Sequence, residues 1–143
     1  MAFAPKLSAM LLGGISVIMF IAYLASILGG NSGLSSLFSG LFTFSVLLLS
    51  GYIGFAGHRN LDLRPFPCFL NGAFISGTAF LVLLIGVSLA TVAMGNSLSL
   101  EVTMLVPVLI MALAGGICGL AGWFVARMLD KGDKSPAPEG IAA

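Results

Sequence analysis

The sequence predicts an all-α integral membrane protein, a bundle of four transmembrane helices. The chain of 143 residues is 59% hydrophobic and only 8% charged, whereas soluble domains carry about 25% charged residues. Four apolar stretches each reach the roughly 20 residues that a helix needs to cross a bilayer core. None of these stretches has Asp, Glu, Lys, Arg or His in its interior. Lipid is therefore the solvent for most of the chain.

The predicted spans are about 7–28, 34–57, 67–93 and 102–126. Each must be helical, because lipid offers no hydrogen-bond partner to exposed backbone N–H and C=O groups. The first span is longer than the apolar run of about 7–15 residues in a signal peptide, so we expect it to be retained. Residues 1–126 then form one membrane domain, and 127–143 form a polar cytoplasmic tail.

All six Lys and Arg residues fall on one side of the membrane if the chain crosses four times. They are Lys6, Arg59, Arg64, Arg127, Lys131 and Lys134. The opposite side carries only Glu101, at the start of the fourth span, where the helix dipole favours a negative charge. Because cytoplasmic loops are enriched in Lys and Arg, we expect both termini in the cytoplasm, in a bacterial inner membrane or an organelle equivalent.

Two similar segments indicate an internal duplication. GYIGFAG at 51–57 and GICGLAG at 116–122 share the pattern G-x-x-G-x-A-G, and a shift of 65 residues (116 minus 51) relates them. The same shift aligns GNS at 30–32 with GNS at 95–97. Chance among abundant Gly, Ala and Leu is the alternative explanation. We predict two tandem helical hairpins related by a parallel repeat about the membrane normal.

Glycines recur at helical spacing in the second and fourth predicted spans, and the third carries Gly72, Ser76 and Gly77 at related spacing. Lipid tails are as apolar as leucine, so close backbone approach through small residues holds membrane helices together. We expect these glycines to lie at helix contacts within the chain, or to contact a partner subunit or a flat ligand. The candidates are Gly51, Gly54, Gly57, Gly115, Gly116, Gly119 and Gly122.

His58, the only histidine, opens the polar connection predicted at 58–66. We interpret it as an interfacial residue at the end of the second span. Axial ligation of a haem or a chlorin pigment is the alternative, and no other cofactor and no metal site is predicted. The arginines Arg59, Arg64 and Arg127 are expected to contact lipid headgroups or a partner, or to act only as topology determinants.

The sequence also gives predictions for Asp62, Pro107 and Cys68. Asp62 lies between two arginines of the connection and is expected to pair with one of them. Pro107 is predicted to remove one hydrogen bond in the second turn of the fourth span, as a tolerated kink, as a hinge or as a break that lines a site. Cys68 lies beside the membrane, next to Arg64, and is a candidate for acylation.

Composition and motifs argue against several function classes. A net charge of +1 gives no basic patch for nucleic acid. No Ser–His–Asp or Cys–His arrangement predicts an enzyme. The predicted spans also lack the intramembrane carboxylates, His or Lys that mark ion pathways.

We therefore expect a non-catalytic small integral membrane protein, an accessory or structural subunit of a larger membrane complex. Its expected partners are other membrane subunits and lipid. The alternative is a small transporter or channel for a neutral or lipid-like cargo, working as a homo-oligomer. Uncharged spans and abundant small residues favour the first function, and the internal repeat favours the second.

Overall fold

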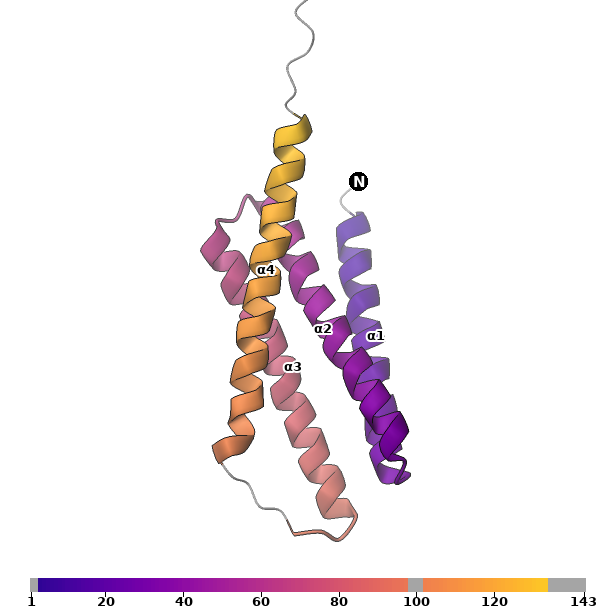
Figure 1. Ribbon diagram of the computed structural model, residues 1–143. Helices are drawn as coiled ribbons and strands as arrows, with labels where there is room; N and C mark the ends of the chain where they lie inside the picture. The colour runs from indigo at the N-terminus through magenta and orange to yellow at the C-terminus, as the bar shows by residue number, and fades with distance from the viewer. Residues whose placement is uncertain (1–2, 98–101, 134–143) are drawn as a thin grey trace, which may run out of the picture.

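Four long helices run in alternating directions along a common axis in the computed structural model (Figure 1). Its backbone is described for residues 3–97 and 102–133, and its side chains for residues 8–97 and 102–132. The helices are α1 (Phe3–Leu28), α2 (Ser32–Leu61), α3 (Pro65–Ala93) and α4 (Leu105–Asp133), and the short 3-10 helix η1 (Val102–Met104) precedes α4. All four are long and apolar enough to cross a membrane. The prediction of an all-α, multi-pass four-helix bundle is confirmed.

The connection between α2 and α3 is shorter than the sequence indicated. α2 continues to Leu61, so His58 and Arg59 lie in its last turn, where the helix dipole favours basic residues. Asp62 ends the helix in the left-handed conformation, with φ 51°. Pro65 then occupies the first position of α3, which suits proline because that residue needs no backbone N–H.

α4 is also longer than its predicted span. It continues to Asp133, about two turns into the segment expected as a polar tail. Residues 127–131 read Arg-Met-Leu-Asp-Lys, and Arg, Met, Leu and Lys have high helix propensity. Lys131 lies in the last turn, where a positive charge interacts favourably with the helix dipole. Residues 134–143 lie outside the described part of the chain.

The described basic side chains gather at one end of the bundle. The N-terminal end of α1, the α2–α3 connection and the C-terminal end of α4 all lie at the top in Figure 1. That end carries Arg59, Arg64, Arg127 and Lys131. The opposite end carries the α1–α2 turn and the α3–α4 connection, and Glu101 lies outside the described residues.

The helices do not pack equally. α2, α3 and α4 pack closely on one another, whereas α1 packs on α2 and only lightly on α3. α1 contributes Phe20, whose ring centroid lies 6.0 Å from that of Phe42 in α2. Phe42 in turn lies 5.9 Å from Phe80 in α3. These rings form an apolar core with buried Val46 and Leu83, distinct from the region where the glycines lie.

Candidate functional site

α2 and α4 cross with their backbones in direct contact at predicted glycines. A β-carbon added to Gly54 would overlap the carbonyl oxygen of Gly119 and lie 2.8 Å from its carbonyl carbon. A β-carbon on Gly122 would overlap the carbonyl oxygen of Gly51. Neither contact leaves room for a methyl group. Glycine is therefore what allows these two helices to approach so closely.

α3 packs into the same crossing through small residues. A β-carbon on Gly72 would overlap the carbonyl oxygen of Gly115, and one on Gly119 would overlap that of Cys68. Ser76 Oγ fills the space where Gly115 would carry a β-carbon. Cys68 and Ser76 are both fully buried, with 0% exposure. Three helices thus meet at one densely packed point.

Two buried hydroxyls at this point bond to backbone carbonyls. Ser76 Oγ donates to the carbonyl of Gly72 at 2.7 Å. Ser50 Oγ donates to the carbonyl of Val46 at 2.9 Å and lies 3.4 Å from that of Gly72. Both hydroxyls are satisfied, as lipid surroundings require. We call this set the glycine core: Ser50, Gly51, Gly54, Cys68, Gly72, Ser76, Gly115, Gly119 and Gly122.

The other two predicted glycines meet side chains instead of backbone. A β-carbon on Gly57 would lie 3.1 Å from Leu63 Cδ1 and 3.6 Å from Cys68 Sγ. One on Gly116 would lie 2.5 Å from the ring of Phe69. Side chains can move more readily than backbone, so these two positions restrict substitution less than Gly54 and Gly122 do.

Positions related by the 65-residue shift have different neighbours. Gly57 packs on Leu63 and Cys68, whereas its counterpart Gly122 packs on Gly51. The two hairpins therefore use their matching glycines in different contacts. Superposition of the hairpins about the membrane normal stays a prediction.

α1 lacks the small residues through which α3 reaches the glycine core. The residues of α3 at these contacts are Cys68, Gly72 and Ser76. The residues 65 positions earlier, in α1, are Phe3, Leu7 and Leu11. Because close helix approach in lipid depends on small residues, this difference gives a physical reason why α1 remains outside the crossing of α2, α3 and α4.

A second cluster joins α4 to the basic end of the bundle. His58 Nε2 lies 3.4 Å from Asp130 Oδ2, and the His58 ring packs edge-on against Trp123, with centroids 5.5 Å apart. Trp123 Nε1 donates to the carbonyl of Leu63 at 3.0 Å. The Arg127 guanidinium lies 5.2 Å from the Trp123 ring centroid. We call these five residues the polar clasp, because they link α4 to the end of α2 and to the connection that follows it.

The two ring nitrogens of His58 have different surroundings. Its side chain is 15% exposed, and Nε2 faces Asp130. The other ring nitrogen, Nδ1, is buried and has no hydrogen-bond partner among the described residues. An axial ligand must direct a ring nitrogen at the metal of a large flat group. Axial ligation of a haem or a chlorin by His58 stays a hypothesis.

The three predicted arginines are exposed, but they are not equivalent. Arg127 stacks on Trp123, and Arg64 is the residue before α3. Arg59 lies in the last turn of α2. The expected pairing of Asp62 with Arg59 or Arg64 is not found in the described part of the chain, where the observed ion pair is that of the clasp.

The cysteines are free thiols. Cys68 Sγ donates to the carbonyl of Gly54 at 3.6 Å, and the side chain is fully buried. A thiol in that position is closed to an acylating enzyme, so the structure gives acylation no support. Within residues 3–97 and 102–133, no three His, Cys, Asp or Glu side chains lie together as a metal site would need.

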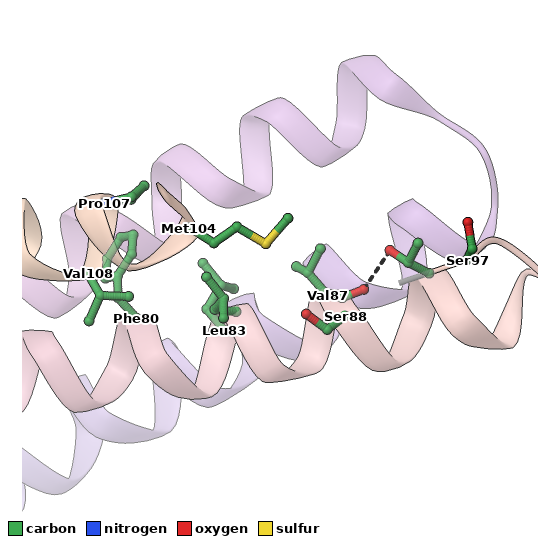
Figure 2. Close-up of a pocket in the computed structure, with 10 residues that line it drawn as sticks. Phe80, Leu83, Val87, Ser88, Ser97, Met104, Pro107 and Val108 are labelled. Carbon is green, nitrogen blue, oxygen red and sulfur yellow. Dashed lines mark hydrogen bonds between the residues drawn. The ribbon is translucent and has the colours of Figure 1, made fainter. Parts of the chain in front are cut away.

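A cavity of about 320 Å³ lies between α3 and the start of α4. Figure 2 shows part of its lining: Phe80, Leu83, Val87, Ser88, Ser97, Met104, Pro107 and Val108. Its walls are mostly apolar, with three hydroxyl residues, Ser88, Thr91 and Ser97. Thr91 Oγ1 donates to the carbonyl of Val87 at 2.8 Å. Among the described residues that line the cavity, none is charged.

Pro107 does not interrupt a helix. α4 begins at Leu105, so Pro107 is its third residue and lies in the first turn, not in the second turn as expected. Backbone N–H groups of a first turn have no partner within their helix, so a proline there removes no helical hydrogen bond. The structure gives neither the kink nor the hinge a physical basis.

Sequence reasoning did not assign several residues to these clusters, among them Cys68, Ser50 and Asp130. Cys68 belongs to a series of small residues four positions apart, with Gly72 and Ser76, and that spacing could have identified one helix face. Ser50 gave no such signal. Asp130 was assigned to the tail, and only recognition that α4 continues past residue 126 could have brought it next to His58.

A scan against models of protein families finds no match for this chain, and searches of the curated proteins and of the solved structures find no similar protein.

Proposed function

We propose that this chain is a non-catalytic accessory or structural subunit of a larger membrane complex. An exposed apolar surface near the end of α4 supports this most. It consists of Phe124, Val125, Met128 and Leu129, which are 52%, 50%, 59% and 56% exposed. Their spacing puts them on one side of the helix. We call this surface the α4 end face.

Met128 and Leu129 of the α4 end face follow the predicted span 102–126, whereas Phe124 and Val125 lie at its end. The 29 residues of α4 extend about 44 Å at 1.5 Å per residue, whereas the bilayer core is about 30 Å thick. Trp123, a residue type enriched at membrane interfaces, is fixed to the α2–α3 connection. The last turns of α4 project past that connection (Figure 1). Apolar side chains in that zone gain most from a protein partner.

The interior of the bundle agrees with a structural role. The glycine core contains no charged side chain, and its hydroxyls are satisfied by backbone carbonyls. Small residues there hold three helices at short distances, which favours a rigid shape. A rigid membrane bundle with a projecting apolar helix end suits a subunit that positions or stabilises others.

Native mass spectrometry of the tagged chain, extracted in mild detergent, tests this proposal. We expect heterologous membrane subunits in a fixed ratio to the chain. The double variant Met128→Ser with Leu129→Ser should lose them while keeping its own fold. The matched control is Val92→Ser with Met94→Ser, which changes two exposed apolar residues near the opposite end of the bundle. Purification of the wild-type chain alone would contradict the proposal.

The cavity between α3 and α4 favours a second candidate, a small transporter or channel. Its uncharged lining suits a neutral or lipid-like cargo, and such a small chain would work as an oligomer of copies. This candidate predicts a homo-oligomer without other subunits. It also predicts cargo movement in proteoliposomes that Val87→Trp blocks, because the larger side chain fills the cavity. A complex with fixed heterologous partners and no effect of Val87→Trp would exclude it.

A further inference from the structure

A second apolar surface lies on the side of α2 between α1 and α4. It is a groove of about 630 Å³, left open because α1 packs on α2 and not into the crossing with α4. Phe44, Leu48 and Phe55 line it from α2, and Cys118 and Ala121 line it from α4. In the part of the chain that the structure describes, no charged residue lines the groove. Its lining therefore suits an apolar chain.

An arginine without an acidic partner stands at one end of this groove. Arg59 is four residues after Phe55, so it continues the same face of α2. Its guanidinium lies 6.0 Å from the centroid of the Phe55 ring, so the side chain points back toward the groove. Arg59 is exposed, and among the described side chains no carboxylate lies within ion-pair distance of it.

We propose that this groove binds an anionic phospholipid, with an acyl chain along the apolar walls and the phosphate on Arg59. The charge of the site decides in favour of this occupant. A guanidinium presents its donors in a planar arrangement that matches the oxygens of a phosphate. Arg59 lies in the last turn of α2, and that end of α2 is at the same end of the bundle as the C-terminal end of α4 (Figure 1). Lipid headgroups gather around basic residues at such an end. A second apolar helix in the groove would offer no anionic partner to Arg59.

The site is selective only through its arginine, since the groove would accept the chain of any phospholipid. One Lys or Arg near the surface of an anionic membrane contributes about 1 kcal/mol, which corresponds to about a fivefold preference. The inference depends on the membrane location of the chain and not on its role as a subunit. It can therefore hold or fail separately from the proposed function.

Lipid retention by the purified full-length chain tests the headgroup site. The probes are phosphatidylglycerol and phosphatidylcholine with identical acyl chains, counted as bound lipids by native mass spectrometry. We expect the wild type to retain phosphatidylglycerol about fivefold better, and Arg59→Gln to reduce the two to near equality. Arg64→Gln is the matched control, because α3 and the connection before it contribute nothing to the groove. An unchanged preference in Arg59→Gln would overturn the proposal.

A second variant tests the acyl-chain site. Ala121→Leu fills part of the groove from an exposed position on α4, and we expect it to reduce retention of both lipids. Ala25→Leu makes the same change at an exposed residue of α1 outside the groove and should retain both. If Ala121→Leu instead alters the oligomeric mass and leaves lipid retention unchanged, a helix occupies the groove and the lipid proposal is wrong. Displacement of phosphatidylglycerol by equimolar inorganic phosphate would also overturn it.

Discussion

Gly14 and Gly54 show that glycine serves different purposes within one membrane chain. Both lie inside helices, but a β-carbon on Gly14 would meet nothing within 4 Å, while one on Gly54 would overlap backbone. Glycine in a helix interior costs about 1 kcal/mol relative to alanine in soluble proteins. At Gly54 the contact with α4 offsets that cost, whereas at Gly14 no contact with the rest of the chain does.

Alanine substitution should separate these two positions. We expect Gly54→Ala to destabilise the fold by about 1–3 kcal/mol, the range for overpacking a well-packed core. Gly14→Ala should be neutral or stabilising by up to about 1 kcal/mol, because it adds helix propensity without a clash. Thermal unfolding in detergent measures both. Equal stability of the two variants would show that the backbone contact of Gly54 does not hold the bundle.

Alanine substitution should affect the stability of the fold differently at Gly51 and at Gly122, although these two residues contact each other. A β-carbon on Gly51 would lie 3.5 Å from the carbonyl oxygen of Cys118, an ordinary contact, whereas one on Gly122 would overlap the carbonyl oxygen of Gly51. We expect Gly51→Ala to keep near wild-type stability and Gly122→Ala to lose about 1–3 kcal/mol. The two variants serve as controls for each other. The reverse order of stability would mean that the two helices are rotated relative to this structure.

The ends of the helices differed more from the prediction than the positions of the helices along the chain did. The apolar runs located all four helices, because hydropathy over about 20 residues is a local property of the sequence. The ends of α2 and α4 lie within polar segments, where helix propensity, caps and tertiary contacts decide. His58 and Asp130 come together only because both helices continue past their apolar runs. No local signal in either segment indicates that contact.

Pro107 gives a prediction at the start of α4. Since it lies in the first turn, Pro107→Ala restores no helical hydrogen bond and should change stability by less than about 1 kcal/mol. Moving the proline two turns onward, as Ala114→Pro, should destabilise α4 by about 3 kcal/mol or more. Circular dichroism and thermal unfolding measure both variants. A large gain in helix content from Pro107→Ala would show that the proline does interrupt α4.

The polar clasp gives a second prediction for the same helix. Trp123→Phe keeps an aromatic ring but removes the hydrogen bond to the carbonyl of Leu63. We expect a loss of about 0.5–1.5 kcal/mol and faster amide hydrogen exchange in the last turns of α4. Phe124→Leu, at the exposed neighbouring position, is the control and should change neither. If exchange in Trp123→Phe stays at the wild-type rate, the clasp does not hold α4.

For the whole molecule, the sequence predicted which segments cross the membrane but not which helices touch. The pattern of glycines indicated close packing in the second and fourth spans. Small residues also indicated packing in the third span. The sequence did not indicate that α1 would stay outside the crossing, because that depends on comparing equivalent positions of α1 and α3. The open groove follows from this asymmetry, and it could not be predicted from any one segment.

Orientation in the membrane is a prediction for the whole molecule. The basic end should face the cytoplasm, so Arg64→Cys should react with a membrane-impermeant maleimide only from the cytoplasmic side. Asn96→Cys, in the turn that follows α3, should react only from the opposite side. Native Cys68 is buried and should stay unlabelled, which provides an internal reference. Labelling of Arg64→Cys from the outside would invert the orientation.

The crossing of α2, α3 and α4 also determines the order in which a growing chain can become stable during biosynthesis. Gly54 contacts Gly119, so α2 cannot complete its packing until α4 has been synthesised and inserted into the membrane. A chain stopped before α4 would expose the small-residue faces of both remaining partners to lipid. Such a chain would be a natural target for membrane proteases or holding chaperones. Quality control could therefore distinguish finished from unfinished copies by the arrival of a single helix.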